Sequence, residues 1–390
     1  MSAYLDHAAT TPVLPEAVAA MTDQLLRVGN ASSLHASGRD ARRVVEEARE
    51  TIAAAVGCRP GEVVFTSGGT EADNLAVKGL WWARHDEDPR RRRILVSAIE
   101  HHAVLDAAHW LAEHEGAEVV LLEVDGEGRL DLAAFETALA DDVALVSVMW
   151  ANNEVGTLQP VEEVVALAHA HGVPVHTDAV QAVGQVPVDV GATGVDALTL
   201  TGHKLGGPCG VGALVVRREL PLTALQHGGG QERDVRSGTL DVPAIAAFAT
   251  AVELAVGRRE KYAARVGALR DDLVRRVVEV VPSAVVNGST EHRLPGNAHL
   301  SFPGCEGDSL LMLLDAQGVE CSTGSACSAG VPQASHVLLA MGCGDDHARS
   351  SLRFSLGHSS TPADVDAVVA AIGAAYERAR RAGVVAGLSA

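Results

Sequence analysis

Cys327 stands in an unusual stretch, CSTGSACSAG, at residues 321–330. Every other side chain there is hydrogen, methyl, thiol or a small hydroxyl, which leaves little to bury and much backbone freedom. We therefore expect a mobile loop, and a thiol on such a loop could move between two places. Because the thiolate is a nucleophile, sulfur chemistry is one interpretation of this stretch. A surface turn with an incidental cysteine is the other.

Two ionisable residues follow neighbouring predicted strands. Asp178 ends the run VPVHTD, and Lys204 stands in TGHKLGGP, one strand-helix-strand unit later. In an open parallel sheet ligands bind beyond the carboxyl ends of the strands, so both side chains should face one cleft. A desolvated lysine can form a Schiff base with an aldehyde, and a pyridine ring held there would need an acidic partner for its nitrogen. A structural ion pair at the strand rim is the alternative.

A glycine-rich turn, SGGTEADN, follows an earlier predicted strand. Gly68 and Gly69 let the backbone approach a ligand, Thr70 can cap the next helix, and the start of that helix attracts an anion. The turn suits a phosphate, although an ordinary tight turn would have the same composition. It matches neither G-x-x-x-x-G-K-[ST] nor G-x-G-x-x-G, which argues against a nucleoside triphosphate or a dinucleotide.

The elements that must position these residues alternate between strands and helices, which predicts an α/β fold with a mostly parallel sheet covered by helices on both faces. The run at 212–217 follows its predecessor after a short Gly-rich turn, so we expect it to be antiparallel. Helical periodicity is clear at 46–56 and 132–140. The predicted strands are 62–66, 93–97, 117–122, 143–150, 173–178, 196–201 and 212–217.

A long helical stretch, about 242–281, is expected to lead out of this main domain. Shorter strands (VECS, LRFSL) and helices (GDSLLMLLDAQG, ADVDAVVAAIGAAYERA) then predict a smaller α+β C-terminal domain. We place the large domain at 15–255. The small domain takes residues 1–14 and 256–390 and carries the cysteine loop.

The formal charge of −19, from 31 basic and 50 acidic residues, argues against strong direct nucleic-acid binding. The basic runs at Arg90–Arg93 and Arg378–Arg381 are typical of solvated charge. The sequence shows no secretory signal and no apolar run long enough to span a membrane, so we expect a cytoplasmic protein. Six cysteines without close pairs fit a reduced compartment. The spacing of Cys321 and Cys327 is wider than that of usual zinc ligands, so no metal site is expected.

A set of motifs in a fixed order gives the chain a family resemblance: YLDHAATTP, FTSGGTEADN, EHHAVLD, NNEVGT, HTDAVQAVG, TGHKLGGP, HGGGQERDVRSGT, CSTGSACSAG and SLRFSLGH. In this order they resemble the pyridoxal-phosphate cysteine desulfurases of the NifS/IscS group, within the class V aminotransferase-like set. The resemblance runs from residue 3 to about 375. It implies the fold type I architecture of pyridoxal-phosphate-dependent transferases, with a seven-stranded sheet in the large domain.

The resemblance also implies site roles. Lys204 would bind pyridoxal 5'-phosphate covalently, Asp178 would pair with the ring nitrogen, and His101 would stack on the ring and assist proton transfer. Gln181 would contact the phenolic oxygen. The phosphate would be bound by Gly69, Thr70, Thr201 and His203, and by Thr239 of the other subunit of a homodimer. Asn153, which would also contact the cofactor, and Arg353 would hold the substrate carboxylate.

The implied reaction converts L-cysteine to L-alanine and leaves the sulfur as a persulfide on Cys327. The loop would then carry it to an iron-sulfur scaffold protein or another acceptor, with tRNA thiolation as a further use. A selenocysteine lyase or another class V enzyme is an alternative that does not need the thiol. A sulfur- or metal-carrying scaffold with Cys321 and Cys327 as ligands is another.

The sequence departs from the family pattern at two positions. Thr201 stands where serine is common, which keeps the hydroxyl, and His358 stands where a second arginine is common, which leaves any contact there open. His102 receives no role from the resemblance. Cys321 could relay or quench the persulfide, but a buried thiol at a strand end is the expected interpretation.

Overall fold

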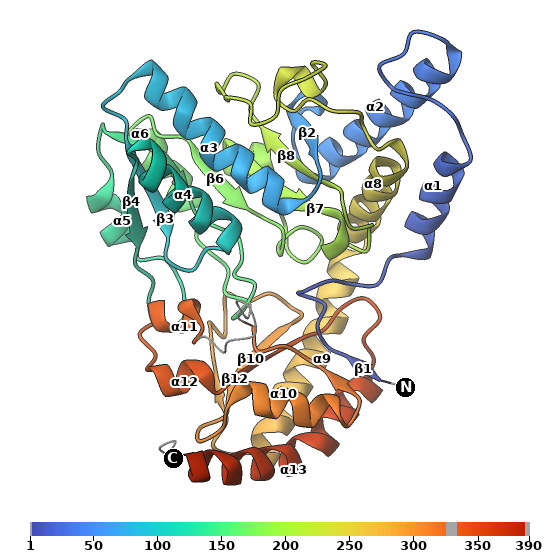
Figure 1. Cartoon of the computed structure of the whole chain (residues 1–390). Helices are drawn as coiled ribbons and strands as arrows, with labels where there is room; N and C mark the ends of the chain where they lie inside the picture. The colour runs from blue at the N-terminus through green and yellow to red at the C-terminus, as the bar shows by residue number, and fades with distance from the viewer. Residues whose placement is uncertain (1, 325–333, 387–390) are drawn as a thin grey trace.

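A seven-stranded sheet forms the centre of the larger part of the molecule (Figure 1). The structure is a computed structural model that describes residues 2–324 and 334–386. The strand order is β2-β8-β7-β6-β5-β3-β4. The strands are β2 (Val63–Thr66), β3 (Arg93–Ser97), β4 (Glu118–Leu122), β5 (Val143–Ser147), β6 (Val175–Asp178), β7 (Ala197–Thr201) and β8 (Gly212–Val216).

The sheet is parallel from β7 to β4, and β8 is antiparallel to both of its neighbours. This confirms the predicted α/β fold, including the reversed strand. The turn between β7 and β8 is too short for a crossover helix, so the chain can only return beside the strand it has left. A short 3₁₀ helix, η2 (Gly202–Lys204), occupies part of this turn.

Helices cover both faces of the sheet, because alternate strand residues point to opposite sides. Val63 and Phe65 of β2 pack into one core and Val64 into the other. The first core includes residues of α2 (Ala36–Val56), α5 (Leu132–Ala138), α6 (Val161–Ala170) and α8 (Val242–Gly257). The second includes residues of α3 (Gly69–Glu87) and α4 (His102–Glu115). α1 (Pro15–Leu25) packs on α8, and α7 (Val190–Thr193) precedes β7.

The C-terminal part has a core of its own, below the large sheet in Figure 1. An antiparallel sheet has the order β12-β10-β9, and β1 pairs in parallel with β11. The strands are β1 (Ala3–Tyr4), β9 (Val285–Val286), β10 (Asn297–Ser301), β11 (Val319–Glu320) and β12 (Ser351–Ser355). The helices are α9 (Arg259–Val280), α10 (Gly307–Asp315), α11 (His336–Ala340), α12 (Asp345–Arg349) and α13 (Pro362–Ala386).

Two details bear on the predicted domains. The helical stretch expected over 242–281 is two helices that meet at Arg258, directly after Gly257, a residue of low helix propensity. Ala3 and Leu5 pack in the C-terminal core although they begin the chain. The boundaries 15–255 for the large domain and 1–14 with 256–390 for the small one remain our proposal.

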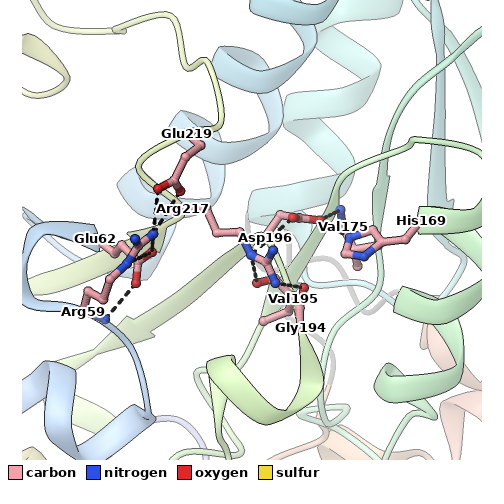
Figure 2. Close-up of polar contacts among 9 residues, drawn as sticks. All are labelled: Arg59, Glu62, His169, Val175, Gly194, Val195, Asp196, Arg217 and Glu219. Atoms are coloured by element: carbon pink, nitrogen blue, oxygen red, sulfur yellow. Dashed lines mark hydrogen bonds and ion pairs between the residues drawn. The ribbon is translucent and has the colours of Figure 1, made fainter.

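The carboxylate of Asp196 contacts residues of neighbouring strands and helices at the amino edge of the large sheet (Figure 2). Its Oδ2 lies 2.7 Å from Nε2 of His169 and accepts a 2.9 Å hydrogen bond from the backbone N–H of Val175. Its Oδ1 lies 3.4 Å from Nε of Arg217. These contacts fix the starts of β6 and β7 and the residue after β8, whereas the predicted site residues lie at the opposite edge.

Candidate active site

A cavity of about 430 Å³ opens at the carboxyl edge of the large sheet. Residues from the N-terminal segment, from several strand ends and from the C-terminal part line this cavity. The predicted site residues that line it are Gly69, Thr70, His101, Asn153, Asp178, Gln181, Thr201, His203, Lys204 and Arg353.

The two remaining predicted residues are not in this lining. Thr239 is exposed on the surface, and Cys327 lies outside the described residues. Ser322 and Gly324 on one side of the undescribed segment, and His336 on the other, do line the cavity. Both flanks of the segment that contains Cys327 therefore reach the same cavity as Lys204.

Lys204 ends η2, directly beyond β7. Its Nζ donates hydrogen bonds to the backbone carbonyls of Ala8 and Ala9, the latter at 2.6 Å. Burial, followed by the positive charge of Arg353, lowers the pKa of Lys204 to about 8. Near neutral pH a useful fraction of this amine is consequently unprotonated and able to attack a carbonyl carbon.

Asp178 is the last residue of β6, the strand beside β7, so it lies next to Lys204 as the spacing predicted. It is buried, and its Oδ1 accepts a 2.8 Å hydrogen bond from the backbone N–H of Val180. Burial raises the pKa of Asp178 to about 6, although that hydrogen bond and Lys204 oppose the rise. A buried carboxylate that faces a cavity is suited to hold a protonated ring nitrogen.

The turn between β2 and α3 is built to accept an anion. Gly68 has φ 157° and ψ −176°, a conformation that is almost confined to glycine. No side chain among the described residues caps the start of α3, so its first N–H groups remain available beside Thr70 and Gly69. A helix start without a side-chain cap, a buried carboxylate and a lysine amine around one cavity fit pyridoxal phosphate.

His101 and Gln181 lie on the cavity wall. The Nδ1 atom of His101, which caps α4, accepts a 3.1 Å hydrogen bond from the backbone N–H of Ala103. Burial, and then the charge of Lys204, lowers the pKa of His101 to about 4, so the ring is neutral near pH 7 and carries its proton on Nε2. Gln181 donates a 2.9 Å hydrogen bond to the carbonyl of Ala8, one of the two acceptors of Lys204.

Arg353 lies on β12, across the cavity from the large sheet, and is buried. Its Nη1 donates to the backbone carbonyl of Asn153 at 2.9 Å and its Nη2 to Oδ1 of Asp6 at 2.8 Å. The buried Nε has no hydrogen-bond partner among the described residues. Each terminal nitrogen carries a second N–H beyond these contacts, and Arg353 lines the cavity, so the guanidinium can still offer donors to a substrate carboxylate.

Sequence reasoning missed several residues in or near this cavity, of which Asp73 and Ala8 line it and Glu100 and Asp6 do not. Asp73 and Glu100 are buried carboxyl groups whose pKa values are raised by burial and by the charge of Asp178. The signal was available for Asp73, which interrupts the apolar face of α3. Asp6 and the carbonyl of Ala8 could not be found, because only the tertiary fold brings them to Arg353 and Lys204.

Two further expectations concern Cys321 and His358. Cys321 follows β11 and is buried, which confirms the expected thiol at a strand end, and burial raises the pKa of this thiol to about 12. His358 is not among the residues that line the cavity; its Nδ1 lies 3.3 Å from Oγ1 of Thr11. His102, which received no role, does line the cavity.

Comparison with known proteins fits this arrangement. The family described as Aminotransferase class-V matches residues 3–368. The chain belongs to this family. An IscS-like cysteine desulfurase of Mycobacterium tuberculosis is 58% identical and covers 98% of each chain. The cysteine desulfurase IscS of Methanosarcina thermophila is 42% identical over 94% of this chain and 90% of its own length.

Solved structures give the same answer for the fold. A NifS-like protein has a TM-score of 0.88 at 34% identity and covers all of both chains. A protein described as SspA in complex with cysteine has a TM-score of 0.80 at 32% identity, over 93% of this chain and all of its own. The resemblance to the NifS/IscS group, the fold type I architecture and the dependence on pyridoxal phosphate are thereby confirmed.

Proposed function

We propose that this protein is a cysteine desulfurase that converts L-cysteine to L-alanine and retains the sulfur as a persulfide on Cys327. The observation that supports this best is the position of Ser322, Gly324 and His336, which place both ends of the Cys327 segment at the cavity of Lys204. Relatives named as cysteine desulfurases, 42–58% identical over nearly the whole chain, support the same activity.

The residues that would hold the cofactor are those of the cavity. Lys204 would bind its aldehyde carbon, Asp178 would keep the ring nitrogen protonated, and His101 would stack on the ring. Gln181 would contact the phenolic oxygen. The phosphate would lie on Gly69, Thr70, Thr201 and His203, with Thr239 from a second subunit. When bound, pyridoxal phosphate supplies a ring that withdraws electrons from the substrate carbon next to the carboxylate.

The chain's own groups would then carry the transfer. Asn153 and the free donors of Arg353 would bind the substrate carboxylate, and the amine of Lys204, with the neutral ring of His101, would accept and return protons. The Cys327 thiolate would attack the substrate sulfur, so that an S–S bond forms as the C–S bond breaks. The electron pair of that bond stays with the carbon skeleton, which takes up a proton and leaves as alanine.

We further propose that the protein is a homodimer that delivers persulfide sulfur to an iron-sulfur scaffold protein or another acceptor. The connection between α1 and α2 lies at the outer edge of the molecule in Figure 1. It exposes large apolar side chains that a second copy would cover. They are Leu26, Val28 and Leu34, which are 84%, 86% and 89% exposed.

The proposed location is the cytoplasm. The five cysteines among the described residues are free thiols, as in a reducing compartment. None of the helices in the described ranges is sufficiently long and apolar to traverse a bilayer. Arg90, Arg92 and Arg93 each pair with a carboxylate, which supports the absence of strong nucleic-acid binding.

The experiment that tests this proposal is peptide mass spectrometry of the holoenzyme after exposure to L-cysteine without a reducing thiol. We expect one additional sulfur atom on the peptide that contains Cys327, removable by dithiothreitol. Sulfur found on Cys321 or Cys209 instead, with none on Cys327, would contradict the assignment of the acceptor.

A further inference from the structure

A carboxylate, Glu71, lies on the turn that we propose for the cofactor phosphate. It is the third residue of α3, directly after Gly69 and Thr70, which line the cavity. Its Oε2 accepts a 2.7 Å hydrogen bond from the backbone N–H of Ser67, so the carboxylate cannot turn away without losing that bond. Glu71 does not itself line the cavity, but it follows Thr70 directly, so its fixed negative charge would repel a phosphate bound on the turn.

Arg236 covers this carboxylate from another part of the chain. Its Nε donates to Oε1 of Glu71 at 2.7 Å and its Nη2 to Oε2 at 3.2 Å, a two-point contact. The two side chains are only 17% and 21% exposed, so salt screens this pair less than a surface pair. Burial opposes ionisation of Glu71, but the hydrogen bonds from Arg236 and Ser67 outweigh it and lower the pKa of Glu71 overall.

The loop that presents Arg236 has an unfavourable backbone. Glu232, Arg233 and Asp234 have φ values of 47°, 61° and 61°, in the left-handed region that residues other than glycine rarely adopt. Such conformations persist only where the surroundings enforce them, and they are concentrated at functional sites. We therefore expect this strained loop to position a side chain that serves function.

A buried ion pair enforces this conformation. The carboxylate of Glu232 accepts hydrogen bonds from both terminal nitrogens of Arg49, at 2.8 and 2.7 Å, and one from the backbone N–H of Phe65, at 2.8 Å. The side chains of Arg49 and Glu232 are 9% and 2% exposed. Phe65 lies in β2, which precedes the phosphate turn, and Glu71 lies in α3, which follows it. The loop therefore contacts both sides of the turn, through Glu232 and through Arg236.

We propose that Arg236 sets the affinity for the cofactor by neutralising Glu71, which keeps the turn attractive to a dianionic phosphate. Arg236 acts through Glu71, so it is a positioning residue. The proposal rests on the proposed function, which places the phosphate on this turn. Two other arrangements compete with it: a direct contact between Arg236 and the phosphate, and an ion pair that serves the fold alone.

The test is a double-mutant cycle on the full-length apoprotein, with the dissociation constant of pyridoxal phosphate measured by absorbance at low and high ionic strength. We expect Arg236→Gln to weaken binding about tenfold at low ionic strength, because the charge of Glu71 is no longer neutralised. At high ionic strength the loss should be smaller, because salt screens the repulsion between Glu71 and the phosphate. Glu71→Gln should bind at least as tightly as the wild type. The double variant Glu71→Gln/Arg236→Gln should return to within about twofold of it.

A double variant as weak as Arg236→Gln would overturn the proposal, since Arg236 would then act without Glu71. An affinity loss in Arg236→Gln that is independent of salt would do the same. Arg236→Lys keeps the charge and should bind nearly as the wild type does, which supplies a second variant if Arg236→Gln does not fold. Arg276→Gln, which breaks the remote 2.7 Å pair with Asp366, is the matched control and should leave binding unchanged.

Failure of this proposal and failure of the proposed function give different results. If the wild type itself binds no pyridoxal phosphate, the proposed function fails. If the wild type and the Arg276→Gln control bind it normally and only the cycle departs from expectation, the function stands and the role of Arg236 is wrong. Thermal unfolding of each apoprotein separates a loss of affinity from a loss of fold.

Discussion

Two side chains proposed to contact the cofactor meet at one backbone atom, the carbonyl oxygen of Ala8. Both Lys204 and Gln181 donate to it. The carbonyl comes from the N-terminal segment, and it fixes where both side chains point before any ligand is bound. The neighbouring Asp6 does the same for Arg353. A short segment at the start of the chain thus orients the groups that would bind the cofactor and those that would bind the substrate.

The lowered pKa of Lys204 predicts the pH dependence of cofactor capture. Because its pKa falls from 10.5 to about 8, the fraction of reactive neutral amine should reach half its maximum near pH 8 and level off about one pH unit above that. His101 and His203 have pKa values of about 4 and do not titrate in this range, and Asp178, at about 6, titrates below it. Stopped-flow absorbance of apoprotein mixed with pyridoxal phosphate measures the rate. A rate that still climbs towards pH 10 would contradict this explanation, and Lys204→Ala is the blank.

Replacing Arg353 with lysine should affect substrate binding more than the cofactor. A lysine keeps the charge but has no planar fork, so it cannot replace the contacts with Asp6 and Asn153 and still offer a donor to a carboxylate. We expect KM for L-cysteine to rise about tenfold with the cofactor spectrum unchanged. Steady-state kinetics with alanine as the measured product provide the check, and an unaltered KM would place the carboxylate elsewhere.

Within the described part of the chain, the loop of residues 230–238 has the least favourable backbone geometry. The left-handed residues 232–234 are followed by Ser237, whose hydroxyl accepts from the N–H of Gly230 at 3.3 Å, and by Gly238, whose N–H donates to Gln231 at 2.9 Å. The loop is therefore closed on itself as well as bound to Arg49. Its composition gives no indication of three consecutive left-handed residues, which explains why the sequence could not predict them.

Glycine at position 234 should relieve part of this strain. Asp234 is exposed and has φ 61°, a conformation that glycine adopts without a Cβ clash. We expect Asp234→Gly to raise the free energy of unfolding by about 1 kcal/mol. Urea denaturation of the apoprotein measures this, with Asp308→Gly in the first turn of α10 as the control that should destabilise. A lower free energy of unfolding in Asp234→Gly would show that the Asp234 side chain stabilises the fold by more than its left-handed backbone conformation destabilises it.

The strands of the large sheet could be predicted from the sequence because each is a short apolar run followed by a turn. The antiparallel direction of β8 followed from the length of one turn, and the adjacency of Asp178 and Lys204 followed from one strand-helix-strand unit. The contributions of Asp6 and Ala8 could not be predicted, since they depend on β1 pairing with β11 near the far end of the chain. Two-residue strands such as β1 leave no periodicity to detect.

For the whole molecule, the position of Thr239 is the main argument for a second subunit. It is exposed and does not line the cavity of its own chain, although the family resemblance assigns it to a phosphate. A dimer would bring the residue to the partner's cavity and would cover the apolar connection between α1 and α2. Assembly and cofactor binding would then depend on each other.

A charge in that connection should separate the subunits. Val28 is 86% exposed, so Val28→Asp should leave the monomer fold intact while placing a carboxylate in the proposed interface. Sedimentation velocity should show mainly monomer, with weaker binding of pyridoxal phosphate. The same change at Met312, which is 73% exposed on α10, is the control that should leave the dimer unaffected. A Val28→Asp protein that stays dimeric would move the interface elsewhere.

The most direct measurement is alanine formation from L-cysteine, with a reducing thiol present, by the wild type and by Cys327→Ala, both loaded with pyridoxal phosphate. We predict that the wild type turns over, and that Cys327→Ala keeps the cofactor spectrum but forms no alanine, because nothing accepts the sulfur. Cys321→Ala should keep its activity, since that thiol is buried. Equal alanine formation by the wild type and Cys327→Ala would contradict the role of the Cys327 thiol and indicate a lyase that expels its sulfur unaided.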